Sequence, residues 1–98
     1  MEELVSLGKI LSDSNRVRII ALLKRDKELC VCEICDTLEL SQPLVSRHLK
    51  QMRETNIVQT MQNGKWKVYS LVHRPEIVFL FQDIAMRNLP KLISCSSR

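Results

Sequence analysis

The chain has 98 residues, a formal net charge of +4, four cysteines and four aromatic residues. This length fits one domain, residues 1–98, and an apolar fraction of 45% with 27% charged residues is typical of a globular protein, which excludes a fibrous chain and argues against disorder. No apolar run approaches the roughly 20 residues of a membrane span, and Glu2, Glu3 and Lys9 do not fit a secretory signal, so we expect a cytoplasmic protein that does not enter membranes.

Helical spacing of apolar residues predicts two helices at the start of the chain, one within residues 1–12 and one over residues 16–25. Asp13 or Ser14 can cap the second helix, because short polar side chains accept hydrogen bonds from the first free N–H groups of a helix. Residues 26–28 are charged, and we expect them to form a connection without regular structure.

A third helix is predicted over residues 31–38, and a fourth follows Ser41 and ends near Glu54. Serine is a good N-cap, and Pro43 is tolerated in a first helical turn. The fourth helix combines a polar, basic half with an apolar stripe of Val45, Leu49 and Met52. Two helices joined by a short turn within residues 31–54 are typical of a helix-turn-helix.

Alternating polarity then predicts a β-hairpin wing over residues 57–71. Asn63-Gly64 is the preferred dipeptide of a two-residue type I′ turn. Helical spacing returns within residues 76–90 and predicts a last helix. The predicted fold is therefore mainly α with a β-hairpin wing, a winged helix-turn-helix in the order four helices, two strands and one helix.

Basic charge is concentrated in residues 41–74, which carry a net +5. A solvated surface is one interpretation, and nucleic acid is the other, because a polar helix can enter the major groove while a wing meets the backbone. The candidate DNA-binding residues are Gln42, Ser46, Arg47 and Lys50 on the fourth helix and Asn63, Gly64 and Lys65 in the wing. Arg53 and Lys67 are expected to be solvated. For His48, a hydrogen-bonded position at the edge of the core and a phosphate contact remain equally open.

Three of the cysteines, Cys30, Cys32 and Cys35, lie within six positions. In a reducing compartment clustered thiols are typical of soft-metal or metalloid ligands or of redox groups. In a regular helix the first two would point about 160° apart, so closing three sulfurs on one atom should distort the start of the third helix. Buried structural cysteines and a Cys32–Cys35 redox pair are the alternatives. An enzyme is not expected, because no nucleophile is paired with a base.

Residues 28–35 read ELCVCEIC, which resembles the ELCVCDLC signature for trivalent arsenic in the arsenical-resistance operon repressors, with Glu33 for Asp and Ile34 for Leu. The resemblance spans residues 4–71. Further matches are DSNRVRI at residues 13–19, SQPLVSRHL at residues 41–49 and GKWKVY at residues 64–69. On these motifs the sequence is similar to the ArsR/SmtB family of winged-helix metalloregulators.

The resemblance implies a homodimer, built on helices within residues 1–12 and 76–90, that represses transcription from a palindromic double-stranded DNA operator. It also implies that the inducer ligand As(III) or Sb(III) binds the three thiols and releases the DNA. Among the residues of the fourth helix, it implies that Ser46 and His48 contact DNA.

Two repressors of the same fold are the alternatives, one responsive to thiol redox state and one responsive to Cd or Pb. Relatives that sense cadmium or lead recruit cysteines from an N-terminal extension, and no cysteine here precedes Cys30. Relatives that sense zinc use His and Asp of the last helix, which offers Asp83 but no histidine. Three-sulfur coordination of arsenic or antimony is therefore favoured. Cys95 fits none of these patterns and is expected to be an incidental thiol, with an extra ligand as the other interpretation.

Overall fold

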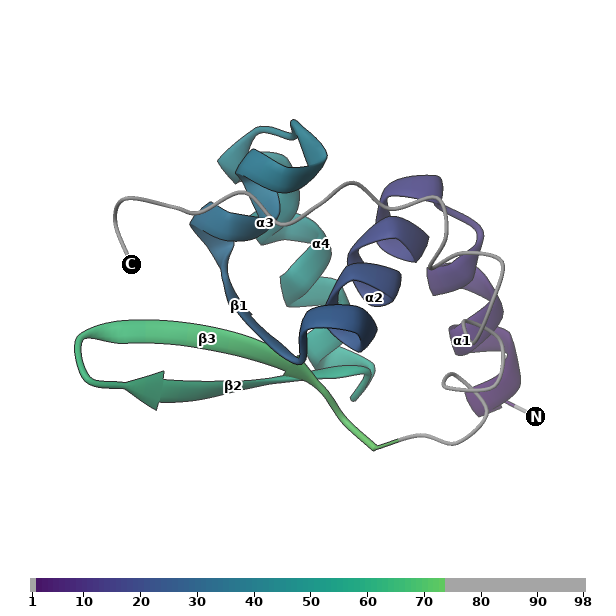
Figure 1. The fold of residues 1–98 in the computed structure, drawn as a ribbon. Helices are drawn as coiled ribbons and strands as arrows, with labels where there is room; N and C mark the ends of the chain where they lie inside the picture. The colour runs from purple at the N-terminus through teal and green to yellow at the C-terminus, as the bar shows by residue number, and fades with distance from the viewer. Residues whose placement is uncertain (1, 74–98) are drawn as a thin grey trace.

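The computed structural model describes residues 2–73 (Figure 1). Their elements are α1 (Glu2–Leu11), α2 (Ser14–Asp26), β1 (Glu28–Cys30), α3 (Val31–Leu38), α4 (Gln42–Glu54), β2 (Val58–Asn63) and β3 (Trp66–Leu71). Within this part of the chain the helices and the hairpin confirm the predicted winged helix-turn-helix. The predicted last helix, in residues 76–90, lies outside the described residues. None of the helices in residues 2–73 is long and apolar enough to span a bilayer.

The caps of α2 and α4 are set by local chemistry. Asp13 Oδ1 accepts the backbone N–H groups of Asn15 at 2.8 Å and Arg16 at 3.2 Å, and Ser41 Oγ accepts the N–H of Leu44 at 3.4 Å. Each bond satisfies an N–H that a helix start leaves without an intrahelical partner. The two predicted boundaries are confirmed, although α2 begins two residues earlier than expected, at Ser14.

The expectation of an irregular charged connection over residues 26–28 is wrong at its end, because β1 begins at Glu28. This short strand pairs antiparallel with β3, with Glu28 opposite Ser70 and Cys30 opposite Val68. The sheet therefore has three strands in the order β1-β3-β2, one more strand than the sequence predicts. Pairing with a distant strand, rather than any local alternation of polarity, makes this segment extended.

The turn of the wing also differs from the prediction. Asn63 pairs with Trp66, so the two turn residues are Gly64 and Lys65 instead of Asn63 and Gly64. Gly64 has φ +64°, and Lys65 is not among the described residues with positive φ. A positive φ at the first turn position alone is the pattern of a type II′ turn, whereas type I′ requires it at both.

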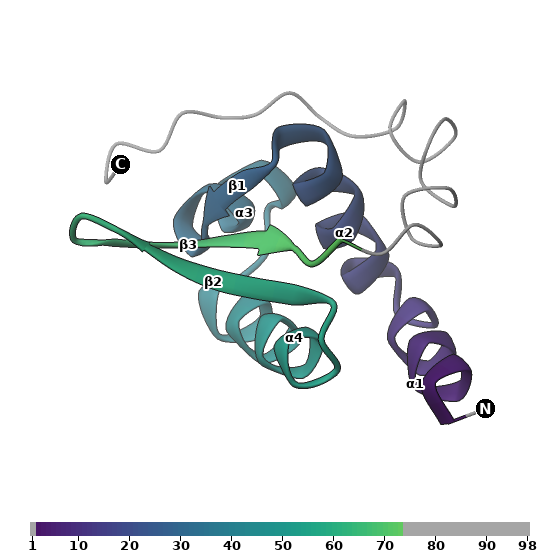
Figure 2. The ribbon, with the colours of Figure 1, turned by 90° about the horizontal axis from the view of Figure 1, so that it is seen from below.

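The core lies where α2, α3 and α4 meet the inner face of the sheet. The stripe predicted on α4 is confirmed, since Val45, Leu49 and Met52 are each 0% exposed. The largest buried side chains of α2 and α3 are Ile19, Ile20, Leu22, Leu23, Ile34 and Leu38, and the sheet adds Leu29, Val58 and Tyr69. Figures 1 and 2 both show the tip of the hairpin and α1 at opposite ends of the domain.

Gly8 and Gly64 allow the effect of backbone conformation on stability to be measured separately from side-chain contacts. A Cβ would meet no atom within 4 Å at Gly8 or at Gly64, so any difference between them comes from backbone conformation. We expect Gly64→Ala to lower the free energy of unfolding by about 1–2 kcal/mol, because alanine is strained at positive φ. Gly8→Ala, within α1, should raise it by about 0.5–1 kcal/mol. Urea unfolding at one protein concentration measures both, and equal effects of the same sign would contradict the assigned turn.

Candidate nucleic-acid interface and thiol site

The outer face of α4 carries the predicted DNA-binding residues of this helix. Gln42, Ser46, Arg47 and Lys50 are all exposed, on the side opposite the buried apolar stripe. On the exposed surface, the guanidinium of Arg16 on α2 donates a hydrogen bond to Gln51 Oε1 of α4 at 2.9 Å, and this bond joins the two helices. A cationic, hydroxyl- and amide-bearing face on a firmly packed helix is suited to phosphate and base-edge contacts.

The wing presents Asn63, Gly64 and Lys65, and all three are exposed. Lys65 Nζ lies 5.5 Å from the centroid of the Trp66 ring, within the range of a cation–π contact. Lys67 is exposed, in keeping with a solvated charge, and its Nζ also lies 5.6 Å from the centroid of the Tyr69 ring. The aromatic rings hold both ammonium groups close to the strand.

His48 lies in the core-facing half of α4 and is 5% exposed. Its Nε2 is 3.9 Å from Asp13 Oδ1, too far for a hydrogen bond, and both ring nitrogens are buried without a partner. The structure thus agrees with a position at the edge of the core but corrects the expectation that the ring is hydrogen-bonded there. Burial lowers the pKa of His48, as do the positive charges of Arg16 and Arg47, and the Asp13 carboxylate opposes them in part.

Cys30 and Glu33 are both buried, and they meet where β1 ends and α3 begins. Cys30 is 5% exposed, ends β1 and has extended backbone as the N-cap of α3, so the helical angle assumed from the sequence does not apply to it. Its N–H donates to Glu33 Oε1 at 3.0 Å. A glutamate three residues after a cap is the spacing of a capping box, and this spacing is the signal in the sequence that could have predicted the bond.

The other two cysteines of the cluster lie on α3. Cys35 is a half-buried free thiol, and burial together with the neighbouring Asp36 and Cys30 raises its pKa. Cys32 Sγ lies 3.7 Å from Asp36 Oδ2. In residues 2–73 no three His, Cys, Asp or Glu side chains are already gathered as a metal site. A ligand that needs three sulfurs must therefore draw them together.

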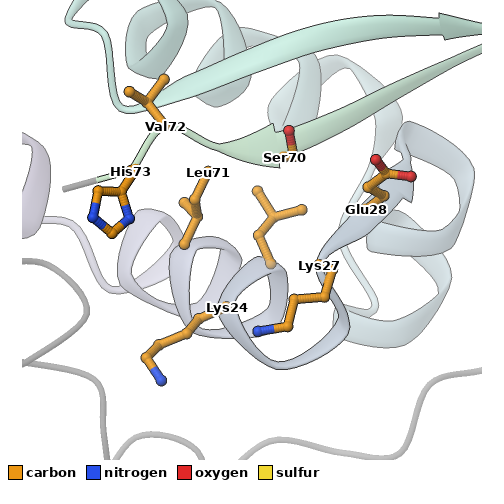
Figure 3. A pocket seen from close by; sticks show the side chains of 8 residues that line it. Lys24, Lys27, Glu28, Ser70, Leu71, Val72 and His73 are labelled. Atoms are coloured by element: carbon orange, nitrogen blue, oxygen red, sulfur yellow. The ribbon is translucent and has the colours of Figure 1, made fainter. Parts of the chain in front are cut away.

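An open pocket of about 300 Å³ lies at the other end of β1, away from Cys30 (Figure 3). Its lining combines cationic and apolar side chains and contains no cysteine: Leu23, Lys24, Lys27, Glu28, Ser70, Leu71, Val72 and His73. The cysteine cluster is therefore not part of this pocket.

Comparison with known proteins gives the same fold and a family. Residues 13–60 match the model described as bacterial regulatory protein, arsR family. An arsenic resistance transcriptional regulator, ArsR1, of Pseudomonas putida is 48% identical over 69 residues, which cover 70% of this chain and 52% of that protein. An arsenical resistance operon repressor of Staphylococcus xylosus is 38% identical over 88 residues, which cover 90% of this chain and 78% of that protein.

The crystal structure of the transcriptional repressor BigR from Xylella fastidiosa matches with a TM-score of 0.80 at 26% identity, over 92% of this chain and 91% of that one. The fold and the polar, basic face of α4 define a winged helix-turn-helix regulator. The chain belongs to the ArsR family of bacterial regulatory proteins. It spans about half the length of the Pseudomonas relative. Because the matched relatives are transcriptional regulators, the expectation that the chain is not an enzyme is confirmed.

Burial of His48 predicts a stability that depends on pH. The folded protein binds a proton at His48 less readily than the unfolded chain, whose histidine has the ordinary pKa of 6.5. The free energy of unfolding is therefore at its full value above pH 6.5, falls as the pH drops from 6.5 toward the lowered folded pKa, and levels off below it; the total loss is about 1.4 kcal/mol for each unit of pKa difference. Urea unfolding at a series of pH values measures this loss.

The matched control for this experiment is the exposed His73. His48→Gln should remove the part of the decline that begins at pH 6.5, whereas His73→Gln should keep it. The loss at lower pH, where the Asp13 carboxylate with its lowered pKa is protonated, should remain in both variants. The same pH dependence in native protein and in His48→Gln would contradict the assignment.

Proposed function

We propose that this chain is a transcriptional repressor that binds a palindromic operator as a homodimer and releases it when As(III) or Sb(III) binds Cys30, Cys32 and Cys35. The observation that carries the proposal is the placement of these cysteines at the start of α3, the helix that precedes and packs on α4. The matched arsenic-resistance regulators of Pseudomonas putida and Staphylococcus xylosus support the choice of ligand.

Thiols suit trivalent arsenic because both partners are soft. Arsenous acid condenses with three thiols, so that three As–S bonds form, three As–O bonds break and three water molecules leave. Arsenic stays trivalent and no electron is transferred. In this chain Cys30 comes from the sheet, while Cys32 and Cys35 come from α3. Gathering them must change the junction between β1 and α3, which supplies the conformational part of the switch.

Release of DNA requires only that the ligand favours a conformation with weaker DNA affinity. A coupling of about 1–3 kcal/mol weakens binding roughly 5–150-fold. The proposed DNA contacts are Gln42, Ser46, Arg47 and Lys50 of α4 and Asn63, Gly64 and Lys65 of the wing. For His48, which the family resemblance adds to this set, a contact requires that its buried ring turns outward.

The proposed dimer uses α1 together with residues 76–90. Val5 on α1 is 56% exposed, which leaves an apolar side chain for a second copy to cover. A chain of 98 residues buries a smaller fraction of its surface than a larger domain does, so a partner also completes its core. Half-sites of the operator are then spaced by about one helical turn of DNA, or by a multiple of it.

The first test of the proposal uses duplexes that the native protein selects from a random library. We expect arsenite to weaken binding of the selected duplex 5–150-fold, in keeping with a coupling of about 1–3 kcal/mol. Cys30→Ser and Cys32→Ser should abolish this response, and Cys95→Ser should leave it intact. A phosphine reductant keeps the thiols reduced without competing for arsenic as a dithiol does. Fluorescence anisotropy of labelled DNA measures the affinities.

X-ray absorption of the arsenite complex should show arsenic bonded to three sulfurs. Release of DNA by the Cys30→Ser and Cys32→Ser variants at the same arsenite concentration as native protein would place the sensor elsewhere. Release by peroxide but not by arsenite would favour the thiol-redox repressor instead.

A second test separates the DNA-binding face of α4 from its other charges. Arg47 and Arg53 are both exposed arginines of this helix, so replacing either by alanine removes the same charge. We expect Arg47→Ala to weaken operator binding by about 1–3 kcal/mol and Arg53→Ala to change it little. Equal losses from both variants would indicate a general charge effect and would contradict the proposed face.

A further inference from the structure

Cys30 belongs to two elements at once. It is the last residue of β1 and the N-cap of α3, and Figure 1 shows β1 leading directly into that helix. The thiol that would share one ligand with Cys32 and Cys35 is therefore attached to the sheet. Displacing it acts directly on the β1–β3 ladder as well as on the first turn of α3.

The register of the sheet connects this thiol to the wing. Cys30 is opposite Val68 of β3, and Val68 is opposite Met61 of β2, so the three side chains share one face of the sheet. Val68 is 1% exposed and stands two residues from Trp66, about 7 Å along the strand. Trp66 closes the hairpin opposite Asn63 and carries Lys65 over its ring.

The far end of α3 is held against movement. Arg18 of α2 donates to the carbonyl of Leu38 at 3.1 Å, and both Leu38 and Ile34 are fully buried in the core. The carbonyl of Cys35 accepts the N–H of Leu40, which tightens the turn toward α4. Of the two ends of α3, the start is tied to a narrow strand and the end to packed helices. We therefore expect ligation of the thiols to displace the start of α3 and not its end.

From this geometry we propose that thiol ligation is transmitted to DNA through the wing: drawing Cys30 toward α3 loosens β1 from β3 at Val68 and displaces Trp66 and Lys65. This inference rests on the proposed arsenite response and specifies its route. The recognition helix α4, held by its buried stripe and by the Arg16–Gln51 bond, keeps its place. Arsenite-loaded protein then still uses α4 on DNA but has lost the contact of the wing.

A thermodynamic cycle tests the route. Lys65→Ala and Arg47→Ala are each titrated onto the selected duplex with and without arsenite, at a salt concentration low enough that the arsenite-loaded complex still forms. Without arsenite we expect Lys65→Ala to weaken binding by about fivefold to tenfold, the share of one phosphate contact at 0.1 M salt. With arsenite this variant should bind as tightly as loaded native protein. Arg47→Ala should cost the same factor in both states.

The outcomes separate this inference from the function on which it rests. If arsenite leaves the affinity of native protein unchanged, the proposed function fails and the route fails with it. If arsenite releases DNA while Lys65→Ala costs the same factor in both states, or costs nothing in either, the proposed function stands and the route through the wing is overturned. Loss of the Arg47→Ala effect in the loaded state overturns it too and assigns the movement to α4.

Trp66 gives a second readout that needs no DNA, because it is the single tryptophan of the chain. Arsenite added to free, reduced protein should shift its fluorescence, and Cys30→Ser should abolish the shift. Unchanged emission at arsenite concentrations that release DNA would overturn the route.

Discussion

The antiparallel pairing of β1 with β3 is the interaction on which the rest of the structure depends. Its three residue pairs join the segment that contains Cys30 to the strand that ends in the wing. Without this pairing, β1 would be a charged loop and Cys30 would be free to follow α3. With it, a thiol that can act as a ligand is fixed on a sheet whose other end carries Lys65. The proposed ligand thiol and the proposed wing contact therefore belong to one sheet and its hairpin turn.

Hydrophobic packing makes the helices harder to displace than the hairpin. The buried side chains of α2, α3 and α4 interlock around Ile34 and Leu49, and closely packed interiors transmit displacement poorly unless a second packing is available. The hairpin beyond Val68 lacks such support, since residues 62–65 are all exposed. Bending a two-stranded hairpin therefore costs less free energy than moving a helix whose stripe is in the core. This difference between the packed helices and the hairpin explains how a small domain can be stable while its hairpin bends easily.

Local signals in the sequence were enough for much of the fold. Asp13 and Ser41 cap the helices they were expected to cap, and the stripe on α4 is buried as its period predicts. Features that depend on distant partners were not predictable in this way. The strand at Glu28 exists only through β3, and the hairpin register moved the turn by one residue. The exposed candidate residues of α4 and the wing followed from periodicity, whereas the unpartnered ring of His48 depends on where α2 lies.

Thiols that are not already gathered as a three-donor site in the described residues suit the proposed switch better than a finished site would. A ligand shifts a conformational equilibrium only by the difference between its affinities for the two states. A site already assembled in the DNA-binding conformation would bind arsenite there without favouring release. Here, the described residues offer no gathered set of three donors, and the backbone of Cys30 is fixed by strand pairing and by the bond from its N–H to Glu33. In the proposed mechanism, arsenite weakens DNA binding only to the extent that it binds more tightly to the conformation in which Cys30 has left this position.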